Sequence, residues 1–189
     1  MGWDAPFMKF PIIETKRLIL RNLHCHDAHG IYSYLSKKEV MKYYDREQLS
    51  SLQEAEELID SLLFRYQSRN QIRWGITLKG ENEIIGTCGF HSLEEEHLKG
   101  EIGYDLNPAY WGKGIMSEAV RALVEYGFSE MNFNRIEALY SPFNYGSKKV
   151  LEKNGFKEEG ILRKRFFIQG KYMDAVLCAV LQEDKRGAI

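Results

Sequence analysis

The feature that most constrains the fold is a turn with two glycines between an extended segment and a helix. Residues 100–106 have the length and pattern of a strand, and a strongly periodic helix follows from Met116. Gly112 and Gly114, on either side of Lys113, let the backbone approach a ligand closely. The first N–H groups of a helix have no partner within it and lie at its positive end. Residues 112–117 are therefore expected to bind a phosphate-bearing ligand, with a turn that binds nothing as the alternative.

Length and composition are those of a soluble globular protein. The 189 residues are expected to form one domain, with a core over about residues 11–181. Hydrophobic residues make up 44% of the chain and charged residues 28%. The formal net charge of −1 argues against a nucleic-acid binder that relies on a strongly basic face, so no direct nucleic-acid contact is expected.

No metal site or membrane anchor is expected either. Cys25, Cys88 and Cys178 are widely spaced, and the histidines at 24, 26 and 29 have no carboxylate or cysteine at ligand spacing. The first residues lack the features of a signal peptide, and the longest apolar run, 175–181, is too short to span a bilayer. A cytoplasmic protein that does not contact membranes follows.

The first half of the chain predicts two helices and an antiparallel meander. Residues 17–23 read as a strand, and Asp27 opens a helix. Ser51 and Glu54 form a capping box for a second helix that ends near Asn70, after a polar connection at 40–48. Residues 72–78 and 83–90 form a hairpin, and a polar loop at 92–99 leads to the strand at 100–106.

The second half predicts a crossover between parallel strands. The helix of residues 116–131 is followed by a strand at 136–140, and a strand, a helix and a strand of this length join parallel neighbours. Asn144 can cap a helix over 145–154 that ends at Gly155, and strands at 156–168 and 171–181 form a closing hairpin. Ligands of such sheets bind at the carboxyl ends of the strands, where residues 112–117 fall.

Three segments, in this order, resemble the GCN5-related N-acetyltransferase (GNAT) superfamily, and within it the RimJ/RimL-like branch. The segments are residues 15–21 with Asp27, residues 110–119 and residues 144–156. The resemblance implies an α/β (α+β) fold, with a mixed, mainly antiparallel seven-stranded sheet and helices on both faces. The central parallel pair, near 100–106 and 135–141, would splay apart to admit acetyl-CoA.

The resemblance also implies which residues bind acetyl-CoA. The pantetheine arm would pair with the free edge of the strand at 100–106, and the pyrophosphate would meet the amides of 112–117. Lys113 would add charge unless its side chain points to solvent. The expected cofactor-binding residues are Leu106, Asn107, Trp111, Gly112, Lys113, Gly114, Ile115, Met116, Ser117, Asn144 and Ser147.

Three positions qualify the resemblance. The superfamily pattern has Gln or Arg at 111 and Gly or Ala at 116, where this chain has Trp111 and Met116. Tryptophan is usual in the branch, and Met116 fits if its N–H binds the ligand while its side chain faces the core. Many members carry a tyrosine acid at the position of Leu151, and leucine cannot protonate a thiolate.

The expected chemistry is direct transfer of acetyl to a primary amine. Glu101 is the first candidate for the base, through water, with pairing to a basic residue or exposure to solvent as the alternative; Asp105 and His91 are weaker candidates. An amide near Leu106 and Asn107 would polarise the thioester carbonyl. Ser147 could donate to the sulfur, and Asn144 could contact the cofactor or peptide, or both could serve the helix start alone.

The acceptor is the open question. The branch favours the N-terminal α-amine of a protein, with ribosomal proteins as the family example. The oligomeric state is not readable from the sequence, although dimers are common in the branch and a homodimer is possible by analogy. A small amine such as a polyamine, an amino acid or a drug is the alternative. A catalytically inactive acyl-CoA-binding or regulatory module is another, because of Leu151. A P-loop nucleotide binder is disfavoured, since residues 112–114 lack the required spacing.

Overall fold

The computed structural model describes residues 3–44, 46–168 and 170–186. Within these ranges the strands are β1 (Ile13–Glu14), β2 (Leu18–Arg21), β3 (Ile72–Leu78), β4 (Gly86–Glu94), β5 (Lys99–Leu106), β6 (Arg135–Tyr140), β7 (Lys157–Ile168) and β8 (Lys171–Leu181). The helices are α1 (Asp4–Met8), α2 (Ala28–Leu35), α3 (Lys38–Met41), α4 (Leu52–Gln67), α5 (Ile115–Ser129), α6 (Tyr145–Lys153) and α7 (Gln182–Arg186). Short 3₁₀ turns are η1 (Cys25–Asp27), η2 (Glu95–His97) and η3 (Pro108–Tyr110).

The strands form a single mixed sheet in the order β1-β2-β3-β4-β5-β6-β8-β7. Every neighbouring pair is antiparallel except β5 and β6, which are parallel and are joined through α5. The predicted fold class is therefore confirmed, but the predicted count of seven strands is wrong. The eighth is β1, whose two residues pair with Leu20 and Ile19 of β2.

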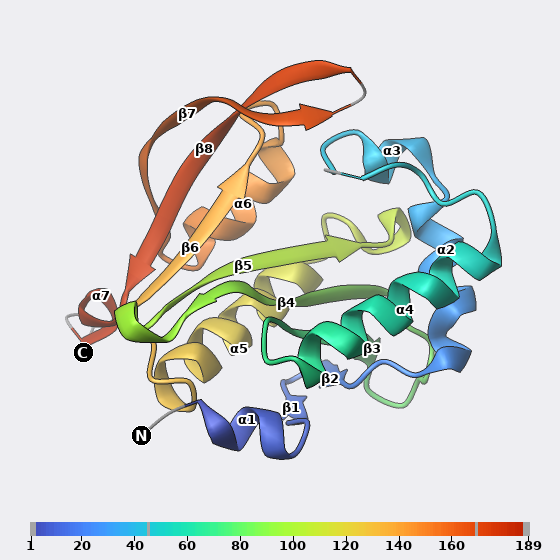
Figure 1. The fold of residues 1–189 in the computed structure, drawn as a ribbon, viewed down its shortest axis with the longest axis horizontal. Coiled ribbons are helices and arrows are strands. Elements are labelled where there is room, and N and C mark those ends of the chain that lie inside the picture. Colours follow the sequence, from blue (N-terminus) through green and yellow to red (C-terminus); the bar gives the residue numbers. More distant parts are fainter. Residues whose placement is uncertain (1–2, 45, 169, 187–189) are drawn as a thin grey trace.

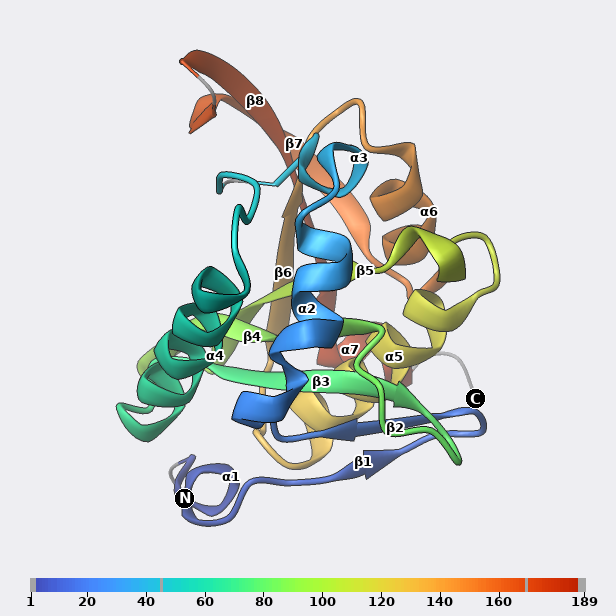
Figure 2. The same ribbon diagram turned by 90° about the vertical axis from the view of Figure 1, so that its right-hand side faces the viewer.

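Helices cover both faces of the sheet, as expected. Figure 2 shows α4 on one side of the strands and α5 and α6 on the other. The larger apolar cluster joins α5 to the strands through residues such as Val120, Leu123 and Phe90. A smaller cluster joins α2 to α4 on the opposite face, around Ile31, Leu35 and Ile59. The apolar stripe predicted on α5 is this core contact, and Met116, 6% exposed, belongs to it.

Local capping follows the sequence closely. Asn144 Oδ1 accepts from the Ser147 N–H at 3.1 Å, and Gly155 has the positive φ of 86° that ends α6. Ser51 Oγ accepts from the Glu54 N–H at 3.2 Å. In a capping box the Glu54 carboxylate would in turn accept from the N–H of Ser51. Here it accepts from the N–H and hydroxyl of Ser50 instead.

Two predicted connections contain regular structure. The polar connection at 40–48 begins inside α3, where Met41 is buried in the smaller cluster. The predicted loop at 92–99 is a tight strand connection, in which β4 extends to Glu94 and β5 begins at Lys99. Leu93 packs against the larger cluster, which holds the end of β4 to the core despite its polar neighbours. The turn of the closing hairpin includes Gln169, which lies outside the described residues.

Candidate active site

The candidate active site is a cleft between β5 and β6. These strands pair only where residues 99–101 face residues 135–137, although β5 continues to Leu106 and β6 to Tyr140. Figure 1 shows the two strands side by side at one end and diverging toward the other. A cleft of about 1450 Å³ occupies the opening, with lining residues from both sides of the sheet. The splay that the resemblance implies is therefore present.

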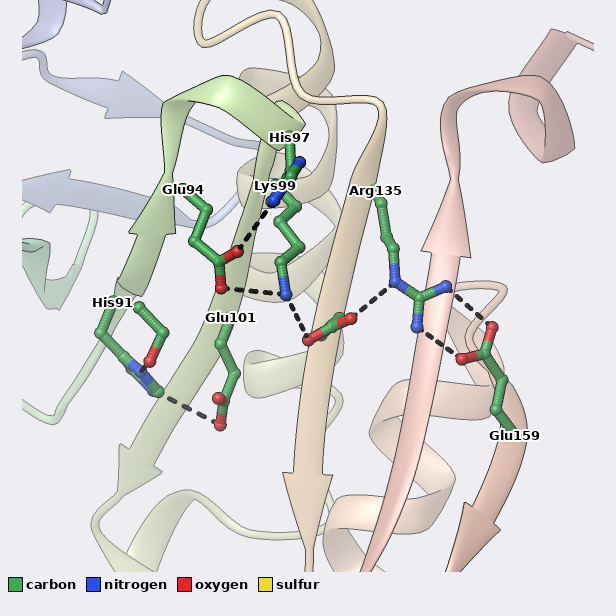
Figure 3. Close-up of polar contacts among 9 residues, drawn as sticks. His91, Glu94, His97, Lys99, Glu101, Arg135 and Glu159 are labelled. Atoms are coloured by element: carbon green, nitrogen blue, oxygen red, sulfur yellow. Dashed lines mark hydrogen bonds and ion pairs between the residues drawn. The ribbon is translucent and has the colours of Figure 1, made fainter.

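Ion pairs fix the closed end of the splay. Lys99 Nζ lies 3.0 Å from Glu94 and 3.6 Å from Glu137 on β6. Arg135 contacts Glu137 at 2.7 Å and reaches Glu159 on β7 at 2.5 Å. Figure 3 shows this chain of charges crossing the strands. Because it joins β4, β5, β6 and β7 where the parallel pairing exists, the strands diverge from a fixed point.

The glycine turn presents a row of free donors at the cleft. Gly112 and Gly114 have φ values of 71° and 73°, in the region that favours glycine. Among the described residues, none of the six N–H groups of residues 112–117 donates a hydrogen bond to the protein; the first N–H paired within α5 is that of Glu118, to Gly114 O at 3.1 Å. A Cβ on Gly112 would meet nothing within 4 Å, so conformation rather than crowding requires glycine there. This arrangement fits a pyrophosphate.

An ion pair from the N-terminal segment holds the glycine turn in place. Arg17 Nε donates to Glu118 at 2.6 Å, and Arg17 Nη1 donates to Lys113 O at 3.0 Å. Glu118 also accepts from the Thr15 hydroxyl and the Arg17 N–H, at 2.7 and 2.8 Å. Burial acts to raise the pKa of Glu118, but these hydrogen bonds outweigh it and the pKa is lowered. The carboxylate is therefore charged at neutral pH and ties the turn to the strand edge.

The free edge of β5 can accept the extended arm of acetyl-CoA, with one correction to the expected donors. The Asn107 N–H donates to Ile85 O at 2.8 Å, so it cannot polarise a thioester carbonyl. Because donors alternate along an antiparallel strand, the N–H of Leu106 points to the opposite side, toward the splay. The Leu106 carbonyl accepts from Trp111 Nε1 at 2.8 Å, so Trp111 braces the strand end.

Ser147 faces Tyr104 on β5, a residue that none of the sequence motifs contains. The hydroxyl oxygens of Ser147 and Tyr104 lie 2.6 Å apart, and both residues line the cleft. Burial raises the pKa of the Tyr104 hydroxyl well above its usual value, although the hydrogen bond with Ser147 opposes the shift. Tyr104 is therefore a neutral hydroxyl at neutral pH, and it can donate a hydrogen bond to Ser147 or accept one from it. Leu151 is 2% exposed and packs in the core.

Glu101 lies on the face of β5 opposite Tyr104, beside His91. Its carboxylate is 3.8 Å from His91 Nε2, and the two side chains point toward each other in Figure 3. The side chain of Glu101 is 17% exposed and that of His91 35%. Both residues line the cleft, and His91 Nδ1 lies 3.1 Å from the Ser92 hydroxyl. Of the two alternatives to a base, pairing with a basic residue is present, and exposure to solvent is small. The role of Glu101 as base stays a prediction.

Asp105 is excluded as a base by its partners. Its carboxylate accepts from the hydroxyls of Tyr34 and Tyr44 at 2.5 and 2.9 Å and from Arg73 Nη2 at 2.6 Å. It also accepts from the N–H and hydroxyl of Thr87, at 3.0 and 2.7 Å. Five donors occupy both oxygens, so no lone pair is aimed at a substrate.

Most predicted site residues meet at this one cleft. Those that line it are Glu101, Leu106, Trp111, Gly112, Gly114, Ile115, Met116, Ser117, Asn144 and Ser147. Asn107 and Lys113 do not: Asn107 Oδ1 accepts from the Ala109 N–H at 3.1 Å, and Lys113 Nζ lies 5.5 Å from the Tyr110 ring. Tyr104 was missed, although alternation along the strand places it on the same face as Leu106.

The cysteines within the described residues take no part in this arrangement. Burial raises the pKa of Cys178 to about 12 and that of Cys88 further. Neither thiol forms a thiolate at neutral pH, which agrees with direct transfer to an amine. No cluster of three or more histidine, cysteine or acidic side chains in the described ranges could hold a metal ion. No helix in those ranges has both the length and the apolar character to cross a bilayer.

Comparison with known proteins identifies the family. The sequence model of the acetyltransferase (GNAT) domain matches residues 17–157. An uncharacterised N-acetyltransferase of Bacillus subtilis, YoaA, is 39% identical over 173 residues, which cover 92% of this chain and 98% of YoaA. The spermidine N(1)-acetyltransferase of Escherichia coli is more distant, at 26% identity over 86% of this chain and 85% of that protein.

Two solved structures are similar over nearly the whole chain. A GNAT-family acetyltransferase from Bacillus anthracis has a TM-score of 0.81 and 32% identity, covering 92% of this chain and 99% of its own. The ribosomal-protein-S5-alanine acetyltransferase of Vibrio fischeri has a TM-score of 0.80 and 26% identity, covering 92% and 98%. These matches confirm the resemblance drawn from the three sequence segments, and the chain belongs to the GNAT family of N-acetyltransferases.

Proposed function

We propose that this N-acetyltransferase acts on the α-amine at the N-terminus of a protein. As a GNAT enzyme, it uses acetyl-CoA as co-substrate. The similarity to a ribosomal-protein-S5-alanine acetyltransferase supports an N-terminal acceptor. An exposed α-amine has a pKa of about 7.7–8.0, against about 10.4 for lysine, so it needs only mild help to become a nucleophile at neutral pH.

The charge of the cleft is the observation that carries this choice of acceptor. Seven basic and four acidic side chains line it, and two of these, Arg73 and Asp105, pair with each other. A site for a polyamine would need an excess of carboxylates to bind several ammonium groups at once. The lining therefore favours an acceptor with a single amine over the spermidine on which a more distant relative acts.

Glu101 is the proposed general base. It is mostly buried, faces the cleft and is held beside His91. It accepts the proton that the attacking amine loses as the new N–C bond forms, directly or through one water molecule. The base and the amine approach from the face of the sheet that carries His91, Arg73 and Asp105.

Ser147 and Tyr104 are the proposed proton source on the other face. When bound, acetyl-CoA supplies the acetyl group as a thioester whose C–S bond breaks to give a thiolate. The Ser147 hydroxyl donates its proton to that sulfur, and Tyr104 donates its own to Ser147 across the 2.6 Å contact. This relay replaces the tyrosine that many relatives carry at the position of Leu151. Tyr104 then recovers a proton from solvent.

The absence of a tyrosine acid at Leu151 does not by itself favour an inactive acyl-CoA-binding module. A hydroxyl pair supplies the missing proton donor from β5 and α6, and Glu101 and the free amides of residues 112–117 complete the machinery. The homodimer stays a prediction, which sedimentation velocity tests.

A competition assay with mass-spectrometric detection tests the proposed function. The purified protein and acetyl-CoA are given equal amounts of an N-terminal peptide, the same peptide with a blocked α-amine and a free lysine, and spermidine. Acetylation of the free α-amine, with CoA released in equal amount, is expected. Preferential acetylation of spermidine or lysine would overturn the proposed acceptor, and CoA binding without transfer to any amine would favour the inactive module.

A further inference from the structure

A buried arginine presents an unused donor to the acceptor side of the cleft. Arg73 lies on β3, and its side chain is only 10% exposed. Arg73 Nε donates to the Thr87 hydroxyl at 2.8 Å, and Nη2 donates to Asp105 at 2.6 Å and to Tyr44 at 3.3 Å. These contacts fix the guanidinium plane. Nη1, by contrast, has no hydrogen-bond acceptor among the described residues, although Arg73 lines the cleft.

The charge of this arginine is permanent. Burial acts to lower its pKa, but the neighbouring Asp105 carboxylate and the Tyr44 hydroxyl outweigh burial and raise it. Nη1 is not among the buried side-chain atoms that lack a partner, so water can reach it through the cleft until a ligand takes that place. A hydrogen bond to a charged group is stronger than one between neutral groups. Nη1 is therefore a strong binding point for an oxygen atom that enters the cleft.

Gly103 opens the space in front of this donor. It lies on β5 between Glu101 and Asp105, at the level where β6 has already separated from β5. A Cβ at this position would come within 3.3 Å of Arg73 Nη1 and within 3.1 Å of His91 Nε2. Any other residue would fill the space between the arginine and the histidine. The absent side chain leaves a notch bordered by Arg73, His91 and Glu101.

We propose that this notch, named here the Gly103 notch, binds the carbonyl oxygen of the acceptor's first residue through Arg73 Nη1. The proposal rests on the function proposed above and specifies the chemical class of its acceptor. In an N-terminal residue the α-amine and the carbonyl carbon are bonded to the same carbon atom. An oxygen held at Arg73 therefore places the amine within a few ångströms, beside the Glu101–His91 pair. The Gly103 notch thereby positions the nucleophile at its base.

The consequence is a requirement for an oxygen next to the amine. Peptides and free amino acids satisfy it, with a carbonyl or a carboxylate. Polyamines and simple alkylamines do not, and binding them would leave the Arg73 donor unpaired. A site built to bond a polar group strongly rejects an analogue that lacks it, because its own buried group is then left without a partner.

A pair of acceptor peptides tests this directly. One is an N-terminal tetrapeptide; the other replaces its first peptide bond with an (E)-alkene, which keeps the geometry and the amine but removes the oxygen together with the amide N–H. The wild-type protein is expected to prefer the tetrapeptide in kcat/KM by at least about 30-fold, equivalent to about 2 kcal/mol. The KM for acetyl-CoA should be the same with both acceptors.

Two variants of the notch and one matched control complete the test. Gly103→Ala puts a methyl group into the notch, and Arg73→Lys keeps a cation beside Asp105 but removes the second terminal nitrogen. Each is expected to reduce the preference for the tetrapeptide to less than about 5-fold. Gly160→Ala, on β7, introduces a Cβ that meets nothing within 4 Å and should keep the wild-type ratio. The quantity compared between wild type and each variant is the ratio of kcat/KM for the tetrapeptide to kcat/KM for the alkene. The two acceptors differ in basicity, but this difference is the same for every protein and so cancels from the comparison.

The outcomes separate this inference from the proposed function. If wild type acetylates the tetrapeptide but Gly103→Ala and Arg73→Lys retain its preference, the Gly103 notch does not bind the carbonyl and the proposed function stands. If no α-amine is acetylated, the proposed function fails. Thermal melting and acetyl-CoA titration of each variant establish that it is folded. Should Arg73→Lys fail to fold, the Gly103→Ala ratio decides alone.

Discussion

At the scale of single residues, Tyr104 is the group on which the proton relay depends. Tyr104→Phe removes one hydroxyl and leaves the ring in the core, so kcat is expected to fall by about 10²-fold, the contribution of a positioned acid. The KM for acetyl-CoA should change by less than about 3-fold, since the ring still packs. Because burial raises the pKa of Tyr104, the hydroxyl stays protonated as pH increases, and the defect should be constant from pH 6 to 9. Steady-state kinetics across this range measure it.

Tyr126→Phe is the matched control for that substitution. Tyr126 lies on α5 at 5.5 Å from the Trp74 ring, and burial raises its pKa to about 12, yet it does not line the cleft. It should keep wild-type kcat. A Tyr104→Phe protein with full kcat, or one that loses acetyl-CoA affinity in place of kcat, would show that the contact with Ser147 only supports the fold.

Glu101 is tested by the shape of a pH profile. Glu101→Gln keeps the size of the side chain and removes the base, so kcat with an N-terminal peptide is expected to fall by about 10²-fold at pH 6–7. The defect should become smaller above pH 8, where the free α-amine is already mostly neutral. Glu96→Gln, whose side chain is 84% exposed in η2, is the control. Full activity of Glu101→Gln throughout pH 6–8 would remove Glu101 from the mechanism.

At the scale of elements, the contact between Arg17 and Glu118 determines how well α5 presents its first amides. Glu118→Gln weakens the pairing with Arg17 and frees the turn that precedes the helix. The KM for acetyl-CoA is expected to rise by about 3- to 10-fold while kcat stays near wild type, because binding is lost equally in the ground and transition states. Glu125→Gln, exposed on the same helix, should leave KM unchanged. A fall in kcat with unchanged KM would mean that the ion pair does not serve cofactor binding.

The same ion pair makes a pH-dependent contribution to stability. The pKa of Glu118 is lowered in the folded protein, so its stabilising effect is present above the unfolded pKa of about 4.3 and is lost as pH falls through the folded value. Denaturant unfolding at pH 7 should therefore find wild type more stable than Glu118→Gln, by no more than about 1 kcal/mol because the Arg17 side chain of the pair is 43% exposed to solvent. The difference in stability should shrink as the pH is lowered below the unfolded value and vanish below the folded pKa of Glu118. A difference in stability that persists at such low pH would mean that the substitution acts through lost packing and not through the ion pair.

Elements with a strong local signal were predictable from the sequence, and contacts between distant segments were not. The stripe of α5, the run of β3 and the caps at Ser51 and Asn144 depend on residues within one or two turns of each other. The two-residue β1 has no periodicity to detect, since it exists only because β2 offers an edge. Arg73 and Asp105 are 32 positions apart, and Tyr104 and Ser147 are 43 apart. Their contacts required the sheet order and register, which no local pattern encodes.

In the candidate site, too, the features that depend on local sequence were predictable and those that depend on strand register were not. The glycine turn was identified because a turn and a helix start are local, and its free N–H groups follow from helix geometry. The assignment of a donor to Asn107 failed because the hydrogen bond to Ile85 depends on the register between β4 and β5. A shift of one residue would have exposed Asn107 to the splay and turned Leu106 away.

At the scale of the whole molecule, the splay leaves one strand edge of β5 unpaired, and a ligand there should be visible as protection from hydrogen exchange. The N–H groups of Tyr104 and Leu106 point away from β4, while that of Asn107 bonds to Ile85. Acetyl-CoA is expected to slow exchange at Leu106 and at residues 112–117, and to leave Asn107 unchanged because it is already protected. The ion pairs at Lys99 and Arg135 hold the closed end, so amides at residues 99–101 should be equally protected with and without ligand.

The same ligand should stabilise the entire fold, because it bridges two halves of the sheet that share only a short parallel pairing. At a concentration 100 times Kd, binding adds about 2.7 kcal/mol, which raises the Tm of a domain of this size by about 5–11 °C. NMR-detected amide exchange measures the protection, and a thermal shift titration measures the rise in Tm. A rise in Tm with protection confined to residues 112–117 would mean that the nucleotide part binds while the arm does not lie along β5. Protection at Asn107 instead of Leu106 would require a different strand register and would remove the oxyanion role assigned to the β5 edge.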